Sequence, residues 1–396
     1  MAGKCCRRLS SPTMPTRISS PPASEAWSRH YRGQPWRVDA TQKKEDQSMI
    51  TVMDRIVVAP ADAHRVEQLL EGQYRQQAGQ RGLHFQSLQY SPPLLTADSP
   101  LTLWVQWQVE SPEAWWVMRA QSATAEVAAF WQALDQLCLS RERTYLMQDS
   151  AGNLPAVAEP IDRPASVRGY RETAQLALID DPGAGAELEA LLNELTAGLP
   201  GLQASHLLRN LAPEYAAGHY TWDLYYTDAR AAAEAQASPA WQGGIAPALE
   251  RLCGAVHAQR LDSLGAGLRD PLLQGGVKRT AFFRLLPGVD ADRAGRFERD
   301  LLEMPRHIAA IRNWRLSRAS AVHWHRADCA PWTYVWEQDF ADLEGLTGPY
   351  MTHPHHWAHV DRWFDPESGA QALDVQLSHA FGFFASSALA AELHND

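Results

Sequence analysis

Residues 277–285 read VKRTAFFRL and are followed by Pro287 and Gly288. This mostly apolar run, bounded by a Pro-Gly turn signal, predicts a buried strand that ends near residue 286. The segments that follow predict a helix, two strands, a helical region and a closing strand, over residues 290–303, 313–319, 333–340, 343–364 and 375–384.

The same order of elements recurs twice upstream. In the first copy, residues 101–109 alternate apolar and polar side chains, which is typical of a strand with one buried face. Strand, helix, strand, strand, helix, strand is the ferredoxin-like βαββαβ plan. We therefore expect an α+β protein of three tandem ferredoxin-like units. The expected units cover residues 51–149, 168–262 and 277–386, and the Pro/Gly/Ala-rich stretches 149–167 and 263–276 are predicted linkers.

A ferredoxin-like sheet carries both of its helices on one face and leaves the other face open. Two such sheets commonly pack face to face into an α+β barrel, because a soluble protein avoids a large exposed apolar patch. Three units are an odd number, so two can pair within the chain while one is left over. We therefore expect a homodimer in which the left-over units pair across a two-fold axis.

Composition narrows the classes of function. The formal net charge is -10, which argues against nucleic acid as a partner, and no apolar run is long enough to span a membrane. The five cysteines are scattered, which indicates free thiols in a reducing cytoplasm. Residues 1–48 are basic, rich in Ser and Pro and without apolar periodicity, so we expect a disordered tail or an over-extended start that precedes the fold.

Residues 350–359 read YMTHPHHWAH and hold four histidines and one tyrosine. Tyr350, His353 and His356 are spaced three residues apart, so a helix would turn them toward one side. Histidine titrates near neutral pH, and a phenol can donate a hydrogen bond to a developing enolate. This spacing therefore favours an acid/base site.

The third unit resembles the stress-responsive dimeric α/β-barrel (Dabb) family. The resemblance rests on the opening strand 277–285 and on the tyrosine–His-Pro–histidine segment 350–356. The first two units share only the plan: Ser238, Pro239 and Trp241 occupy the corresponding segment of the second unit, and the first has no histidine there. We expect them to be degenerate copies that keep the scaffold.

The resemblance implies which residues form the site. In a plant polyketide cyclase of the family, which needs no cofactor, the tyrosine and the last histidine of the segment are the acid/base pair. Here they are Tyr350 and His356, and His353 is a further catalytic candidate. The family's first-strand histidine is replaced by Arg279, which suits a carboxylate or an enolate. With Trp336 and Trp357 as substrate-binding candidates, we expect a cofactor-free lyase, cyclase or isomerase acting on an aromatic or polyketide-like carbonyl compound.

Two other classes stay open. A haem- or metal-dependent oxidoreductase could use His355 and His359, the pair His323 and His325, or an axial ligand such as His356, His379 or His325. A non-catalytic protein could instead hold a hydrophobic ligand in the same cavity, as a binding or stress protein.

Overall fold

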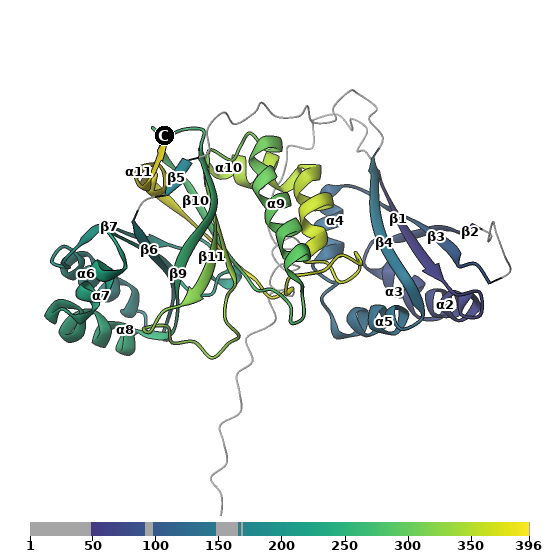
Figure 1. Ribbon diagram of the computed structural model, residues 1–396, viewed down its shortest axis with the longest axis horizontal. Helices are drawn as coiled ribbons and strands as arrows, with labels where there is room; N and C mark the ends of the chain where they lie inside the picture. The colour runs from purple at the N-terminus through teal and green to yellow at the C-terminus, as the bar shows by residue number, and fades with distance from the viewer. Residues whose placement is uncertain (1–48, 92–97, 148–164, 168, 396) are drawn as a thin grey trace, which may run out of the picture.

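The computed structural model describes residues 49–91, 98–147, 165–167 and 169–395 (Figure 1). It contains a four-stranded sheet, an eight-stranded sheet and a small two-stranded sheet. The tail expected at residues 1–48 lies outside the described residues.

The four-stranded sheet is formed by residues 50–147 and has the order β2-β3-β1-β4. In β3, Leu103, Val105 and Trp107 alternate with half-exposed residues and are fully buried against the helices. Ser111 and Thr124 each cap the N-terminus of a helix by accepting a backbone N–H. The strands are β1 (Ile50–Val58), β2 (His84–Ser91), β3 (Leu101–Val109) and β4 (Cys138–Met147), and the helices are α2 (Ala63–Leu69), η1 (Leu70–Tyr74), α3 (Arg75–Gln80), α4 (Pro112–Arg119) and α5 (Ala125–Asp135).

Residues 170–268 supply half of the eight-stranded sheet, in the order β9-β6-β8-β7. Leu188 and Leu192 of the first helix pack with Trp222 of β8 in a core of their own. The strands are β6 (Tyr170–Leu178), β7 (Leu202–Arg209), β8 (Tyr220–Tyr226) and β9 (Cys253–Leu268), and the helices are α6 (Ala184–Thr196), η2 (Pro213–Tyr215), α7 (Ala229–Ala237), η3 (Trp241–Ile245) and α8 (Ala246–Leu252).

Residues 274–386 supply the other half, in the order β13-β10-β12-β11. Asp290 caps the long helix α9 by accepting the N–H of Arg293, and Phe297 and Leu301 turn the apolar face of α9 onto the sheet. The elements are β10 (Gln274–Phe283), α9 (Ala291–His307), β11 (Asn313–Ala321), β12 (Tyr334–Phe340), α10 (Leu343–Gly345), η4 (Leu346–Tyr350), η5 (His355–Val360), η6 (Asp361–Trp363) and β13 (Ser378–Ser386). The C-terminal elements α11 (Ala388–Glu392) and β14 (Leu393–Asn395) follow, and β14 pairs with β5 (Ala165–Val167).

Each group of four strands has the spatial order fourth, first, third, second, with antiparallel neighbours. The predicted α+β class and ferredoxin-like character are therefore confirmed. We propose that these three groups are the three predicted ferredoxin-like units, and we refer to residues 50–147, 170–268 and 274–386 as units 1, 2 and 3.

Units 2 and 3 form a barrel within the chain. Strand β9 of unit 2 pairs with β11 of unit 3, and at the opposite ends of the sheet Leu211 N–H donates to the Phe381 carbonyl at 2.8 Å. The interior is polar: Arg171 and Lys278 both contact Asp223 and Glu337, and all four are at most 2% exposed. The two halves of the eight-stranded sheet are therefore joined by compensating charges.

The predicted linker at residues 263–276 is wrong over residues 263–268 and 274–276, which belong to β9 and β10. Close packing explains two glycines of β9. A Cβ on Gly267 would lie 2.0 Å from the Trp314 ring, and one on Gly265 would lie 2.9 Å from Leu302. The glycines thus allow side chains of unit 3 to approach the strand that joins the two units.

Unit 1 packs against the helices of unit 3 rather than against a sheet, with α4 beside the C-terminal helical region (Figure 1). Trp116 of α4 donates through Nε1 to the Met351 carbonyl at 2.9 Å, and Arg119 bonds Asp361 at 2.6 Å. The sheet face of unit 1 that points away from its own helices carries partly exposed Met53 and Trp104.

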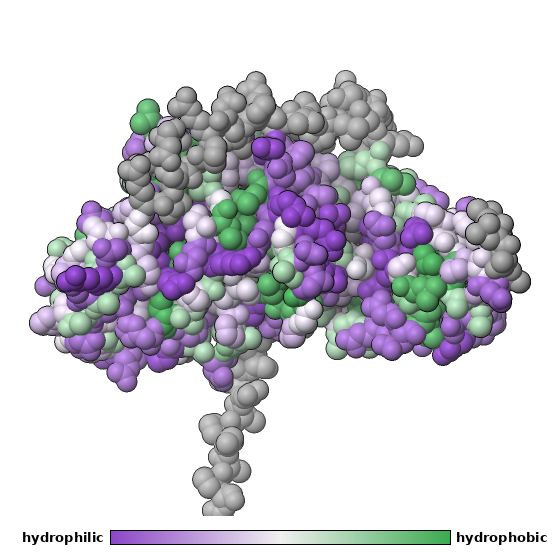
Figure 2. Space-filling view, viewed as in Figure 1, coloured by the Kyte–Doolittle hydropathy of each residue, from purple (hydrophilic) through white to green (hydrophobic). Residues whose placement is uncertain are grey.

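Hydrophilic residues cover the surface over α9 in Figure 2. Among the described residues, no helix combines the length and the apolar character that crossing a membrane requires.

Candidate functional site

Five side chains of unit 3 meet between its sheet and its helices. In the strand register, Arg279 of β10 is opposite Gln338 of β12, and His379 of β13 is opposite Ala281. Because successive strand residues alternate, Lys278 points into the barrel while Arg279 points to the helices. Tyr350 at the end of η4 and His356 in η5 approach from the helical side. The cluster, which we call the unit 3 site, consists of Arg279, Gln338, Tyr350, His356 and His379.

The structure brings the predicted pair Tyr350 and His356 together. Their ring centroids are 4.1 Å apart, and both residues are buried. His356 Nδ1 lies 3.1 Å from the Tyr350 carbonyl oxygen. A carbonyl can only accept, so Nδ1 carries the proton and Nε2 keeps a free lone pair. Burial, together with the positive charge of Arg279, holds the pKa of His356 well below its usual value, so the ring is a neutral base near pH 7.

Arg279 is the charged member of the unit 3 site. It donates to Gln338 Oε1 at 2.8 Å and to His379 Nδ1, and its guanidinium lies 5.4 Å from the centroid of the Tyr350 ring. Only 4% of the residue is exposed. No carboxylate among the described residues lies within 4.0 Å of it, unlike the paired arginines of the barrel interior. Burial lowers the pKa of Arg279, but a guanidinium remains charged.

Tyr350, Gln338 and Trp336 supply the hydrogen-bond donors around Arg279. Burial raises the pKa of Tyr350, and the neighbouring Arg279 opposes that rise, so the phenol is protonated at neutral pH. A hydrogen bond from the Gln338 side chain to the phenol opposes the same rise. Among the described residues, the buried Trp336 Nε1 has no hydrogen-bond partner.

His353, the third catalytic candidate, has a different environment. Its Nδ1 accepts the backbone N–H of His355 at 3.1 Å, and its ring centroid lies 6.4 Å from that of His307. Burial lowers the pKa of His353 to about 4. These contacts indicate that His353 stabilises the start of η5.

The two tryptophan candidates lie on different sides of the helical layer. Trp336 is fully buried in the core of unit 3, in the same cluster as Tyr350. Trp357 belongs to the core of unit 1 instead: its ring lies 5.6 Å from those of Trp115 and Tyr145, and its Nε1 donates to the Thr352 carbonyl. Trp357 therefore joins the units and does not line the unit 3 site.

Unit 1 covers His356. The ring centroids of Trp116 and His356 are 5.0 Å apart. Trp116 lies 235 positions before Met351 in the sequence, although it donates a hydrogen bond to the Met351 carbonyl. No local pattern in the sequence could have assigned Trp116 to this site. Gln338 carried a weak signal, because it lies in a run of polar residues, 337–339, inside a strand that is otherwise apolar.

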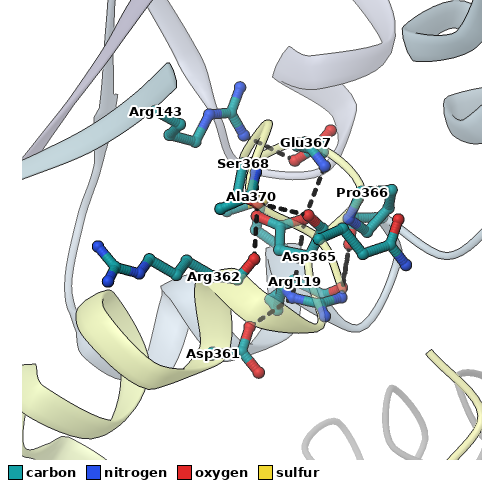
Figure 3. A network of polar contacts seen from close by, with 12 residues as sticks. Arg119, Arg143, Asp361, Arg362, Asp365, Pro366, Glu367, Ser368 and Ala370 are labelled. Carbon is teal, nitrogen blue, oxygen red and sulfur yellow. Dashed lines mark hydrogen bonds and ion pairs between the residues drawn. The ribbon is translucent and has the colours of Figure 1, made fainter. Parts of the chain in front are cut away.

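The loop that follows η6 anchors this arrangement (Figure 3). Glu367 is 1% exposed and accepts hydrogen bonds from Tyr74, Arg81, Trp131 and Arg143 of unit 1. Burial alone would raise the pKa of Glu367, but the two arginines outweigh it and hold that pKa far below its ordinary value. The carboxylate therefore ties unit 1 to the loop that directly follows η5 and η6.

Three other histidines stack beside the unit 3 site. The ring centroid of His355 is 4.1 Å from that of His307 and 4.8 Å from that of His359. His359 Nε2 lies 3.3 Å from Asp300. Across residues 49–91, 98–147, 165–167 and 169–395, no three side chains of His, Cys, Asp or Glu are arranged to hold a metal ion.

Two open pockets lie elsewhere. One of about 510 Å³ lies at the junction of units 1 and 3, beside Trp131 and Gly369. The other, of about 300 Å³, lies in unit 2 beside Glu172 and Gln236. Neither of these two pockets is lined by Tyr350 or His356.

The solved structures similar to this chain include the following three, each with a low TM-score. An anthrone oxidase-like protein shares 10% identity, covers 56% of this chain and 94% of its own, and superposes with a TM-score of 0.42. A monooxygenase from Streptomyces coelicolor, in complex with nanaomycin D, shares 22% identity, covers 27% and 91%, and has a TM-score of 0.20. A mutant chlorite dismutase from Candidatus Nitrospira defluvii, in complex with cyanide, shares 10% identity, covers 57% and 93%, and has a TM-score of 0.32.

No curated protein sequence matches the chain. The family model of the stress responsive A/B barrel domain (Dabb) matches residues 277–376, a range that includes Arg279, Tyr350 and His356. The resemblance expected from the sequence is therefore confirmed for this part of the chain: its third unit matches the stress responsive A/B barrel domain.

Proposed function

We propose that this chain is an enzyme that performs acid–base chemistry in unit 3 on a carbonyl-containing aromatic or polyketide-like small molecule. His356 Nε2 takes a proton from the carbon next to the carbonyl, and the Tyr350 hydroxyl donates a hydrogen bond to the enolate oxygen. Return of the proton at another carbon, or attack of the enolate on a second carbonyl, completes the reaction. The class is that of a cofactor-free lyase, cyclase or isomerase.

The observation that carries this proposal is the buried guanidinium of Arg279 among neutral partners. A buried charge without a counter-ion is strongly unfavourable, so it is expected where a ligand or a reaction intermediate supplies the opposite charge. An enolate oxygen or a substrate carboxylate would do so here. Arg279 offers a planar fork of donors for either group.

The protonation states support the assigned roles. His356 is neutral at working pH, and its Nδ1–H is held by the Tyr350 carbonyl, so its free nitrogen is available as a base. Tyr350 keeps its proton, as a hydrogen-bond donor requires. One side chain can therefore accept a proton while the other stabilises the charge that develops.

The test is exchange of carbon-bound hydrogen. The probe is 4-oxo-4-phenylbutanoate, which combines an aromatic ketone with a carboxylate, and deuterium uptake from D₂O is followed by NMR. Removal of a general base or of an oxyanion donor costs roughly 10²- to 10⁴-fold, so His356→Gln and Arg279→Gln should slow uptake by about that much. His64→Gln, on an exposed histidine of unit 1, is the matched control.

Exchange that is as fast in His356→Gln as in the original protein would contradict the role of His356. Absence of exchange, combined with tight binding of the probe, would favour the second candidate, a non-catalytic ligand-binding protein. That candidate is favoured by one observation: Trp116 packs on His356, the proposed base.

An oxidoreductase remains the third prediction from the sequence. Its readouts are separate: a Soret band or stoichiometric metal in the purified protein, or oxygen consumption with the same probe. Any of these would replace the cofactor-free lyase, cyclase or isomerase with an oxidative enzyme.

A further inference from the structure

Unit 2 carries a charged residue at the position that Arg279 occupies in unit 3. Arg171 and Lys278 occupy matching places on β6 and β10, because both contact Asp223 and Glu337 inside the barrel. The next residues along each strand, Glu172 and Arg279, therefore point the other way, toward the helices of their own units. The pseudo-symmetric barrel thus has an acidic residue, Glu172, in unit 2 at the position where unit 3 has a basic residue, Arg279.

Glu172 is buried and well ordered by its neighbours. It is 2% exposed, and its Oε2 accepts hydrogen bonds from Gln236 at 2.7 Å and Trp324 at 2.9 Å, while Oε1 accepts from Tyr170 at 3.3 Å. No Lys, Arg or His side chain of the described residues lies within 4.0 Å of its carboxylate. Burial raises the pKa of Glu172, against the lowering effect of the Trp324, Gln236 and Tyr170 donors and of the nearby His323.

A pocket of about 300 Å³ opens beside this carboxylate. It lies between the start of β6 and α7, and the loop after β11 forms its other side. Ala233 and His323 at its edge are exposed, and Arg260 is engaged by Asp262. The lining residues that matter for the argument are Tyr170, Glu172, Gln236, Ala233, Arg260 and His323.

We infer that unit 2 binds a small organic cation, a primary ammonium or an amidinium, through the carboxylate of Glu172. The hydrogen bonds from Gln236, Trp324 and Tyr170 fix the orientation of the carboxylate. These donors are neutral, so they do not balance its negative charge. A positive group in the pocket would supply a counter-ion in direct contact with the carboxylate, which no described side chain does within 4.0 Å. The volume is at the lower end for ligand pockets, which fits a molecule the size of a phenylalkylamine.

This inference is independent of the reaction in unit 3, and its test does not depend on turnover. Binding of benzylammonium, phenethylammonium and benzamidinium to the full chain is measured by isothermal titration calorimetry at pH 7.5. Benzyl alcohol and benzoate are the neutral and anionic counterparts. We expect saturable binding of at least one cation and none of either counterpart.

Two variants locate the site. Glu172→Gln keeps the size of the side chain and should weaken cation binding by at least about tenfold, the usual effect of losing a hydrogen bond to a charged group. Ala233→Phe adds bulk to an exposed pocket position without touching Glu172 and should also abolish binding. Arg279→Gln, at the matching position of unit 3, should leave cation binding unchanged.

Binding of no cation in the panel would overturn the inference, as would equal binding by Glu172→Gln. Unfolding curves of each variant separate loss of a site from loss of the fold. If Glu172→Gln is destabilised, the Ala233→Phe result decides, because an exposed alanine carries little of the core.

Discussion

The carboxylate of Glu367 accepts a hydrogen bond from Arg81, a residue 286 positions earlier in the chain, at 2.7 Å. Both residues are buried, and they join unit 1 to the loop that follows η6. Unit 1 lacks the histidine segment. Through this contact it nevertheless holds η5, the helix that carries His356, in place.

The replacement Glu367→Gln should loosen unit 1 from unit 3. Removing one partner of a buried ion pair typically costs about 3–5 kcal/mol. Here Arg81 would lose its counter-ion, while Arg143 would keep its ion pair with Asp54. Urea unfolding should show unit 1 detaching before the barrel unfolds. Glu71→Gln, which breaks an exposed pair with Arg75, should cost less than about 1 kcal/mol. Equal costs for the two variants would contradict the anchoring role.

The replacement Trp116→Ala should expose His356. The indole of Trp116 lies over the imidazole, and its Nε1 holds the Met351 carbonyl. Diethyl pyrocarbonate should therefore modify His356 faster in the variant, as measured by mass spectrometry of the peptide. Trp104→Ala, on the open sheet face of unit 1, is the control and should leave the rate unchanged. A rate that does not rise would show that other side chains close the site.

Stability should fall as the pH drops below about 6.5, the ordinary pKa of histidine. Burial lowers the pKa of His353 and His355 to about 4 and holds those of His356 and His379 well below their usual value. The unfolded chain then binds protons that the folded chain does not, so the free energy of unfolding decreases between pH 6.5 and 4.

Urea unfolding at several pH values measures this slope. The double variant His353→Gln/His355→Gln should show a shallower slope, because it removes two of the groups that titrate only after unfolding. His307, His359 and Asp300 face the same cluster and are unchanged in it. An unchanged slope would mean that these two rings are protonated in the folded protein.

The replacement Gly267→Ala should destabilise the barrel. The added methyl group would lie 2.0 Å from the Trp314 ring, and overpacking of this kind costs about 1–3 kcal/mol or more. Gly243→Ala places its methyl group with no atom within 4 Å and is the matched control. Thermal unfolding compares the two variants. A fully stable Gly267→Ala protein would show that β9 and β11 can separate without cost.

We expect the chain to form a homodimer through the open sheet face of unit 1. That face carries partly exposed Met53 and Trp104 beside polar residues, and Leu146 of β4 is 49% exposed. Light scattering should give twice the chain mass for the original protein and the single mass for Trp104→Glu. Leu272→Glu, at an 83% exposed residue outside unit 1, should remain dimeric. A monomer at all concentrations would contradict the expectation.

Sequence patterns predicted much of this fold because alternation and turn signals are local. The alternating residues 101–109 became β3, and the run 277–285 became most of β10. The glycines of β9 misled the prediction, since their reason is the Trp314 ring, which is distant in sequence. In the candidate site, Tyr350 and His356 meet as their spacing suggested. The positions of Trp357 and Trp116 depend on how unit 1 docks, which no local pattern encodes.

The barrel made from units 2 and 3 is covalently continuous, and this has an evolutionary consequence. A barrel built from two identical chains must carry the same residue in both halves, so a change that benefits one half is imposed on the other. In a single chain each half mutates alone. Glu172 and Arg279 show the outcome: opposite charges at matching positions, which no symmetric assembly of one sequence can have.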